Sequence, residues 1–343
     1  MQAPWYAIIG SGITGLACAR ALVRHGHSVQ LFEKSRGPGG RLASRRTQHA
    51  TFDLGAQYFT ARSGEFQEEL NAWRETGVVG RWPHSLWVCE NGHWQPKLDD
   101  EIRWVGAPRM SALTRYLSQG LDLRTQCRIE HLIQEGAEWW LRDAKGLRHG
   151  PFNKVIVTLP APQALSLLAP HSSLLAQACQ RIEMSPCWAA YALLEASLPR
   201  LEIPEPGWQA AFMNGGPLRF VTRNASKPGR EDQGESLSLL ATSNWSRTHL
   251  ERDPQWVATR LLAAFTERYP APLPDIQLLD AHRWRFAQPE SEMAIGNEAQ
   301  DFLIDSSGLA LGGDGLSAGR LEDAWHSGHR LGNYLSKQEE TTA

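Results

Sequence analysis

The apolar positions near the start of the chain follow the order strand, helix, strand. A short apolar run at 6–9 precedes a stretch with apolar residues at helical spacing, and a second strand-like run at 29–32 ends in an acidic residue, Glu33. Three glycines separate the first run from the helix, and Gly26 follows the helix where a C-terminal cap is expected. This order predicts a βαβ unit of the kind that binds dinucleotides.

Each glycine of this turn has a physical reason. Gly10 permits the tight turn, Gly12 lets a pyrophosphate approach the bare backbone, and Gly15 allows the helix to pack closely on the sheet. The first N–H groups of the helix then point at the phosphates. Glu33 stands where a carboxylate accepts from the hydroxyls of an adenosine ribose. The neighbouring candidates for cofactor binding are Ile13, Thr14 and Lys34.

The patterning changes along the rest of the chain. Strand-like runs at 121–135, 138–143 and 154–159 follow the first unit. From about Ile182 onward, strand-like segments alternate with Pro- and Gly-rich connections and one helix, which favours a mostly antiparallel sheet with a covering helix. The polar run at 224–235 is predicted to be an exposed, mobile loop. A strand at 309–311 and a helix at 321–336 close the chain, and residues 337–343 are predicted to fray.

Composition excludes several classes of protein. With 343 residues, 42% hydrophobic and 21% charged, the chain fits a two-domain globular protein, and a net charge of -2 argues against nucleic acid or an anionic membrane as partner. No apolar run is long enough to span a bilayer, and the apolar start lacks the features of a signal peptide. Five scattered cysteines without a Cys-x-x-Cys pair predict reduced thiols, a cytoplasmic protein and no metal site.

Three glycine-rich segments separated by many residues indicate one extended ligand. Gly39, Gly40 and Arg41 offer backbone N–H groups and a guanidinium to a pyrophosphate. Gly313 and Asp314 offer a carboxylate for hydroxyls, before a helix N-terminus that suits a carbonyl. The first segment alone is compatible with NAD or FAD. Only FAD has a polyol chain between its rings, so the three segments together favour FAD.

The sequence resembles the FAD-dependent amine oxidase superfamily and, within it, the bacterial renalases. The outer motifs specify only FAD, whereas residues 57–60 and 282–284 are narrower and indicate renalase. The stretches that carry the likeness are residues 9–16, 39–41, 53–62, 104–106, 223–228, 241–246, 281–284, 313–314 and 319–325.

The resemblance implies an α/β fold and an activity. We expect a Rossmann-type FAD-binding domain, similar to p-hydroxybenzoate hydroxylase and amine oxidases, and a second α+β substrate domain on a mostly antiparallel sheet. The expected boundaries are 1–75, 106–180 and 286–343 for the FAD-binding domain, and 76–105 and 181–285 for the substrate domain. Renalases bind FAD noncovalently and oxidise the 2- and 6-dihydro isomers of NAD(P)H to NAD(P)⁺. Electrons pass to O₂, which gives hydrogen peroxide, and the role is metabolite repair.

The same resemblance assigns candidate site residues. The turn with Gly55, Ala56, Gln57 and Tyr58 is expected beside the isoalloxazine, and Gln57 and Tyr58 are candidates to touch the ring or the substrate. His282 is a candidate donor to a carboxamide, and Trp284 a candidate wall for the nicotinamide. For both, ordinary core packing is the competing interpretation.

Position 320 distinguishes a renalase-like protein from an aromatic-cage amine oxidase most clearly. Amine oxidases with an aromatic cage carry a tyrosine there, whereas this chain has Arg320, followed by Leu321. Arg320 is a candidate to meet the reduced flavin or the substrate, or else it pairs with Glu322 or Asp323 at the start of the helix. The cysteine that attaches FAD covalently in some amine oxidases has no counterpart among residues 316–318.

Two other functions stay open at this point. One is oxidation of an amine or another small molecule on the same fold, and the other is a flavin-binding redox sensor without catalysis. An aromatic hydroxylase is less expected, because its second NADPH-handling signature has no counterpart near 155–165. The expected partners are a small dinucleotide substrate and O₂, with a monomer or homodimer as the assembly.

Overall fold

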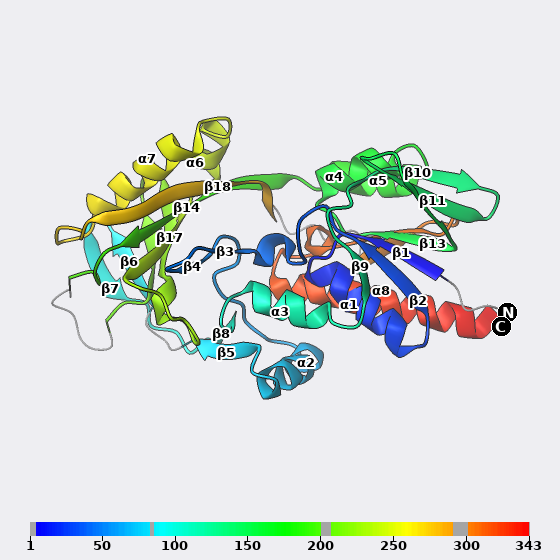
Figure 1. The fold of residues 1–343 in the computed structure, drawn as a ribbon, viewed down its shortest axis with the longest axis horizontal. Coiled ribbons are helices and arrows are strands. Elements are labelled where there is room, and N and C mark those ends of the chain that lie inside the picture. Colours follow the sequence, from blue (N-terminus) through cyan, green and yellow to red (C-terminus); the bar gives the residue numbers. More distant parts are fainter. Residues whose placement is uncertain (1–4, 83–85, 200–206, 291–300, 343) are drawn as a thin grey trace. The chain divides into compact units, whose positions relative to one another are not determined.

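The computed structural model describes residues 5–82, 86–199, 207–290 and 301–342 (Figure 1). The chain forms two compact units. Unit 1 comprises Met1–Gly40, Thr114–Met184 and Gln288–Ala343, and unit 2 comprises Arg41–Leu113 and Ser185–Ala287. Residues 41–75 therefore pack with unit 2, whereas the sequence places them in the FAD-binding domain. The expected boundaries concern which residues bind cofactor and which bind substrate, and they stay a prediction.

Unit 1 is built on a six-stranded sheet, which confirms the predicted Rossmann-type fold class. Its order is β19-β20-β13-β1-β2-β9, and all neighbours are parallel except β19 and β20. The central strands are almost completely buried, as expected for a sheet covered on both faces. The strands are β1 (Trp5–Ile9), β2 (Ser28–Phe32), β9 (Asp122–Arg124), β13 (Lys154–Val157), β19 (Phe302–Ile304) and β20 (Leu309–Gly312).

Helices α1 (Ile13–Arg24) and α8 (Leu321–Thr342) lie side by side on this sheet (Figure 1). Their backbones approach closely because α8 carries two glycines one turn apart. A Cβ on Gly328 would lie 2.0 Å from the carbonyl oxygen of Thr14, and one on Gly332 would lie 2.8 Å from that of Cys18. Only glycine permits this spacing of the two helices. The final residues continue α8 to Thr342, so the prediction of a frayed tail is wrong. Part of the reason is an ion pair between Glu339 and Lys154 at 3.0 Å.

A small antiparallel sheet and two helices complete unit 1. The sheet has the order β10-β11-β12, with β10 (Ile129–Glu135), β11 (Glu138–Asp143) and β12 (Arg148–Phe152). The prediction of one strand over 121–135 is wrong, because β9 joins the parallel sheet and β10 this smaller one. Helices α4 (Ala161–Leu168) and α5 (Ser173–Arg181) share a core with both sheets, including the buried rings of Trp139 and Phe152.

Unit 2 is built on a seven-stranded sheet, as the mostly antiparallel prediction requires. Its order is β18-β14-β17-β16-β15-β6-β7, and the pairing of β15 with β6 is parallel. Helices α6 (Ser243–Thr248) and α7 (Pro254–Thr266) lie on the same side of this sheet (Figure 1). Asp253 caps α7 by accepting from the N–H groups of Gln255 and Trp256. The strands are β6 (Leu86–Glu90), β7 (His93–Pro96), β14 (Met184–Leu194), β15 (Ala210–Asn214), β16 (Leu218–Arg223), β17 (Glu235–Ala241) and β18 (Ile276–Pro289).

Among the described residues, the remaining regular structure consists of two short antiparallel strand pairs in unit 2, two helices and single 3₁₀ turns. The pairs are β3 (Ser44–Arg46) with β4 (Thr51–Asp53), and β5 (Val79–Trp82) with β8 (Arg103–Gly106). The helices are α2 (Gly64–Glu75) and α3 (Ser111–Leu117), and single 3₁₀ turns occupy Gly40–Leu42, Asn224–Ser226 and Asp314–Leu316.

The segment 224–235 is not the exposed loop that its polar sequence predicts. Asn224, Lys227 and Glu235 are buried, and Asn224 accepts a hydrogen bond from the N–H of Asp53. Asp232 likewise accepts from the N–H of Thr51, so the segment is held against β4. Its polar residues form hydrogen bonds with one another and with β4, and a pattern of polar residues alone does not distinguish such pairing from exposure to solvent.

Within the described part of the chain, no helix combines the length and the apolar character needed to cross a bilayer.

Candidate functional site

The glycine turn after β1 has the geometry that its sequence predicts. Gly10 has a φ of +107°, and a Cβ there would lie 2.9 Å from the hydroxyl of Thr158. A Cβ on Gly15 would lie 2.0 Å from the carbonyl oxygen of Gly10, so α1 touches the turn directly. Gly12 differs from both, since a Cβ there would meet nothing within 4 Å. The protein itself therefore does not require glycine at position 12, whereas a ligand lying on the backbone would.

The start of α1 is suited to an anion. Gly12 is the N-cap and makes no side-chain cap, and the first turn carries no acidic residue. The first N–H groups of a helix lack intrahelical acceptors, and the helix dipole favours negative charge there. Ile13 and Thr14, both buried, form this first turn. This donor set fits a pyrophosphate.

The second glycine segment lies against the first within unit 1. The N–H of Gly39 donates to the carbonyl oxygen of Ser11 at 3.1 Å. Gly40 has a φ of +51°, and a Cβ on it would lie 3.4 Å from the Cα of Gly12. Two segments that the sequence separates thus meet beside the N-terminus of α1.

Glu33 is held in place at the end of β2. Its carboxylate accepts hydrogen bonds from the N–H (3.1 Å) and hydroxyl (2.8 Å) of Ser11 and from the N–H of Ser35 (2.8 Å). A carboxylate has about four lone-pair positions, so roughly one remains for a ligand hydroxyl. Lys34, by contrast, reaches the side chain of Gln163 at 3.4 Å on the surface.

The third segment follows β20 in the same unit. Gly313 has a φ of +150° and donates its N–H to the hydroxyl of Ser327 at 2.8 Å, while Asp314 is buried in the 3₁₀ turn that follows. A Cβ on Gly312 would lie 3.4 Å from the methyl group of Thr14, which places this segment next to α1. The segments therefore follow the carboxyl ends of β1, β2 and β20, the edge at which open α/β sheets bind ligands.

Arg320 lies just before α8 and forms an ion pair with Asp323. Its backbone N–H donates to the carboxylate of Asp323 at 2.9 Å, and its guanidinium lies 3.3 and 3.4 Å from the same carboxylate. Asp323 thus caps the helix, which offsets the unfavourable placement of a cation at a helix N-terminus. The Arg320 side chain is 39% exposed, so the pair still presents a cation near the surface. Leu321 is half-buried as the first residue of α8.

In unit 2, the turn after β4 is packed tightly on Arg41. A Cβ on Gly55 would lie 2.0 Å from the carbonyl oxygen of Arg41, and the N–H of Ala56 donates to that oxygen at 3.0 Å. The guanidinium of Arg41 donates to the carbonyl oxygen of Ala287 at 3.1 Å. This turn is therefore held by close packing against Arg41 and by a backbone hydrogen bond to it.

A buried ionic cluster, formed by Asp53, Lys227 and Arg230, lies beneath the turn. Lys227 Nζ and the Arg230 guanidinium lie 2.9 and 2.5 Å from Asp53 Oδ2, and none of these three side chains is more than 1% exposed. Asp53 Oδ1 accepts from the hydroxyl of Ser44 and the N–H of Met110. Burial alone would raise the pKa of Asp53, but the two cations hold it below its usual range. The pairing could not be predicted from the sequence, because Asp53 lies far along the chain from Lys227 and Arg230.

Gln57 and Tyr58 have different environments. The Gln57 carboxamide is buried and fully engaged, with Nε2 donating to the carbonyl oxygens of Asp53 (2.8 Å) and Gly55 (3.0 Å) and Oε1 accepting from Lys227 (3.3 Å). Tyr58 is half-buried among rings, and the Arg103 guanidinium lies 5.3 Å from its ring centroid. The Gln57 carboxamide is thus held by three hydrogen bonds, whereas Tyr58 is held by ring contacts and Arg103, and the roles of both at the flavin or substrate stay a prediction.

His282 and Trp284 lie together on β18. Their rings are 4.4 Å apart and close to perpendicular, and both are half-buried. The indole N–H of Trp284 donates to the carbonyl oxygen of Leu54 at 2.8 Å, which ties β18 to the turn. Burial and the nearby Arg45 lower the pKa of His282 below its usual range, against the effect of Asp280. The imidazole is therefore neutral at neutral pH.

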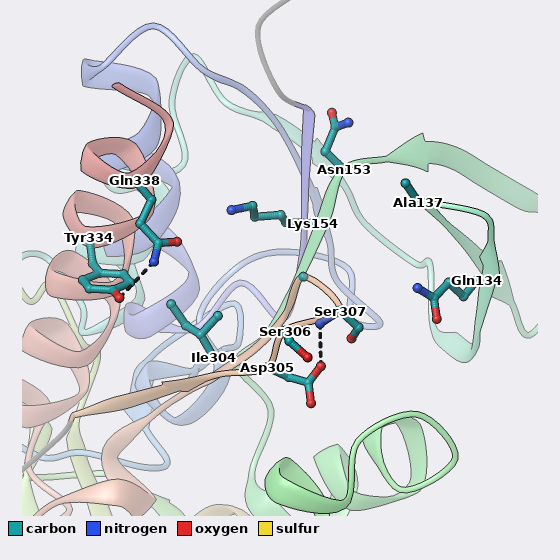
Figure 2. A pocket seen from close by; sticks show the side chains of 11 residues that line it. Gln134, Ala137, Asn153, Lys154, Ile304, Asp305, Ser306, Ser307, Tyr334 and Gln338 are labelled. Atoms are coloured by element: carbon teal, nitrogen blue, oxygen red, sulfur yellow. Dashed lines mark hydrogen bonds between the residues drawn. The ribbon is translucent and has the colours of Figure 1, made fainter. Parts of the chain in front are cut away.

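A polar cavity of about 570 Å³ lies elsewhere in unit 1 (Figure 2). Lys154, Asp305, Tyr334 and Gln338 are among its lining residues, and the Gln338 amide donates to the Tyr334 hydroxyl. Lys154 begins β13, so the cavity lies at the amino ends of the parallel strands, opposite the glycine turn. The cavity is therefore separate from the glycine segments at the carboxyl ends of the strands, where a dinucleotide would bind.

Cys127, Asp143 and His149 form a buried cluster whose residue types could bind a metal ion. The hydrogen bonds favour another interpretation. His149 Nδ1 lies 3.2 Å from the Arg124 guanidinium, which can only donate, so Nε2 carries the proton. Nε2 lies 3.0 Å from Asp143 Oδ2 and donates to it. A protonated Nε2 offers a metal no lone pair, and the cluster is a hydrogen-bonded network.

Solved structures with low sequence identity share this fold. A cyclohexylamine oxidase from Brevibacterium oxydans superposes with a TM-score of 0.76 at 13% identity, covering 98% of this chain and 100% of that one. A putrescine oxidase superposes with a TM-score of 0.70 at 12% identity, covering 99% of each chain.

Sequence comparisons identify the family. A 4,4'-diapophytoene desaturase of Staphylococcus haemolyticus is 45% identical over 49 residues, and the desaturase of Staphylococcus aureus matches equally. These matches cover 14% of this chain and only 10% of the desaturases. Residues 8–73 match the NAD(P)-binding Rossmann-like domain. Residues 76–331 match the flavin-containing amine oxidoreductases. Since this match covers most of the chain and the glycine cradle fits a dinucleotide, the cofactor is FAD and the chain belongs to the flavin-containing amine oxidoreductase family.

Proposed function

We propose that the protein is a renalase-type oxidase, which converts the 2- and 6-dihydro isomers of NAD(P)H to NAD(P)⁺ and reduces O₂ to H₂O₂. The observation that carries this proposal is Arg320. Aromatic-cage amine oxidases have a tyrosine at this position, beside the neutral amine of their substrate. Here a guanidinium fixed by Asp323 stands just before α8.

Electrostatics distinguishes the two substrate classes. A guanidinium of fixed position offers charge-assisted hydrogen bonds to the phosphates and the carboxamide oxygen of a dinucleotide, whereas a small neutral amine has no anionic group for it to bind. Because Asp323 sets the position of the Arg320 side chain, little conformational freedom is lost on binding. The pair therefore supports a dinucleotide substrate over a small amine.

The overall reaction balances with few demands on acid–base groups. A dihydronicotinamide, O₂ and one proton give NAD(P)⁺ and H₂O₂, and bound FAD supplies the two-electron acceptor. The remaining task of the protein is to position the nicotinamide and exclude water. We propose that neutral His282 donates to the carboxamide oxygen, and that Trp284 and Tyr58 contact the nicotinamide ring. The Trp284 indole N–H is already used by Leu54, so only its ring face is available.

The substrate class is tested by mixing the oxidised holoenzyme anaerobically with candidate substrates. We expect 2-dihydro- or 6-dihydro-NAD(P) to bleach the flavin absorbance within one turnover, and admission of O₂ to restore it with one H₂O₂ per bleach. Putrescine, cyclohexylamine and benzylamine serve as the comparison set. Bleaching by an amine and not by the nicotinamide isomers would refute the proposal, and bleaching by none would indicate a flavin-binding sensor.

Arg320→Ala is expected to leave FAD bound but to slow flavin reduction by the dihydronicotinamide about tenfold, the effect of losing one charge-assisted hydrogen bond. Stopped-flow absorbance measures the rate. Arg330→Ala is the matched control, because Arg330 lies on α8 and is likewise paired with an aspartate, Asp301, at 2.5 Å. Equal rates for wild type and Arg320→Ala would assign the Arg320–Asp323 pair to helix capping alone.

We also propose a cytoplasmic location and a role in repairing mis-reduced nicotinamides. All five cysteines are unpaired and buried, which is typical of proteins from reducing compartments.

A further inference from the structure

We propose that the Lys227 ammonium is a positioning group for the Asp53–Gln57 turn, and that loss of its proton loosens this turn. The inference rests on the proposed function only in taking this turn to serve the active site. The turn, its packing and its contacts with Lys227 are independent of the substrate.

Lys227 is placed to act on the turn at two points. Its side chain is completely buried, with Nζ 2.9 Å from Asp53 Oδ2 and 3.3 Å from Gln57 Oε1. The Trp82 ring lies on another side, with its centroid 5.4 Å from Nζ. Lys227 therefore joins the two ends of the turn.

The ammonium also fixes the orientation of the Gln57 carboxamide. Gln57 Nε2 donates to the carbonyl oxygens of Asp53 and Gly55, so Oε1 must point the other way and needs a donor. Lys227 supplies that donor. A reversed amide would direct its NH₂ group at the ammonium and its oxygen at two carbonyl oxygens, which is repulsive on both sides. A charged Lys227 thus selects one arrangement of the turn.

The arrangement depends on the positive charge of Lys227, which its surroundings disfavour. The charged groups that act on it are Asp53 of β4 and, from its own segment, Arg230 and Asp232. Arg230 shares the same carboxylate oxygen, and its positive charge disfavours a second positive charge on Lys227. Burial, opposed by Asp53 and assisted by Arg230, lowers the pKa of Lys227 to about 8. When Lys227 is neutral, its bonds to Asp53 and Gln57 lose their charge assistance.

The test is hydrogen exchange of the oxidised holoenzyme without substrate, read on the peptide that contains Leu54 and Ala56. The N–H groups of these residues donate to the carbonyl oxygens of Ala43 and Arg41, so they report on the turn. After correction for the intrinsic rate, we expect protection in the wild type to fall about tenfold between pH 7 and pH 9.5, the effect of one charge-assisted hydrogen bond. A peptide from α1 serves as the internal reference for global opening.

Two substitutions should remove this pH dependence, one by removing the charge at position 227 and the other by keeping it at both pH values. Lys227→Met should give low protection at both pH values, and Lys227→Arg, which keeps its charge, should give high protection at both. If the arginine does not fit, the methionine variant still decides. Lys154→Met, which removes a lysine paired with Glu339 in unit 1, should behave as the wild type.

Constant protection in the wild type across this range, or wild-type protection of Lys227→Met at pH 7, would overturn the inference. Because no substrate is present, neither result bears on the proposed oxidase activity. Conversely, failure of the dihydronicotinamides to bleach the flavin would leave the positioning role of Lys227 intact.

Discussion

Replacing Asp53 with alanine is expected to lower the free energy of unfolding by about 3–5 kcal/mol, the cost of breaking a buried ion pair by removing one partner. Lys227 and Arg230 share the Asp53 carboxylate, so both would stay buried without it. The hydroxyl of Ser44 and the N–H of Met110 would lose their acceptor as well. Urea unfolding of the holoenzyme, followed by tryptophan fluorescence and flavin release, measures the change.

The matched control is Glu251→Ala. Glu251 is also a single carboxylate between two arginines, Arg283 and Arg285, but it is 67% exposed. Water replaces the lost partner at an exposed site, so this substitution should change stability little. An equal loss of stability in both variants would show that burial of the Asp53 cluster is not the cause.

Asp53→Asn extends the test to acid pH. The folded-state pKa of Asp53 is lower than in the unfolded chain, where an aspartate titrates near about 3.9. The carboxylate therefore contributes stability above that unfolded value, and the contribution is lost as the pH falls through it toward the folded pKa. We expect wild-type stability to approach that of Asp53→Asn as the pH falls below about 4. A constant difference between the two down to pH 2 would contradict this.

The cofactor cradle could be predicted from sequence because its requirements are local. Gly10 and Gly15 are required by one turn and the helix that follows, and Gly12 stands at the fixed spacing from them at which a pyrophosphate would approach the backbone. The sequence also predicts two alternatives for Arg320: contact with the flavin or substrate, which stays a prediction, or pairing with Glu322 or Asp323. The structure selects Asp323, because its carboxylate also caps the backbone at the start of α8.

The buried ionic cluster could not be predicted, for a physical reason. Lys227 and Arg230 lie in a polar segment, and polarity normally indicates exposure. Their burial depends on a carboxylate far away in the chain, on β4, and only the folded backbone brings the three together. The same holds for Gly328 and Gly332, whose spacing on α8 acquires meaning only once α1 is known to lie against them.

Gly15→Ala is expected to abolish FAD binding and to cost about 3 kcal/mol of stability, the upper end of what overpacking a core position usually costs. The added Cβ would lie 2.0 Å from the carbonyl oxygen of Gly10, and the backbone fixes the position of both atoms, so no side-chain rotation relieves the clash. Helix α1 must therefore move off β1. Urea unfolding of the apoprotein and flavin-fluorescence titration measure the two effects, and Gly64→Ala, at a position with nothing within 4 Å, is the control.

Gly12→Ala separates the ligand from the fold. A Cβ at position 12 meets no protein atom within 4 Å, so the apoprotein should unfold at nearly the wild-type urea concentration. If the pyrophosphate lies on this backbone, however, the methyl group occupies its place, and the affinity for FAD should fall at least about tenfold, or 1.4 kcal/mol. A stable apoprotein that binds FAD as tightly as the wild type would mean that the phosphates lie elsewhere. If Gly12→Ala loses affinity for FAD but keeps the stability of the apoprotein, the glycine is required by the ligand and not by the fold.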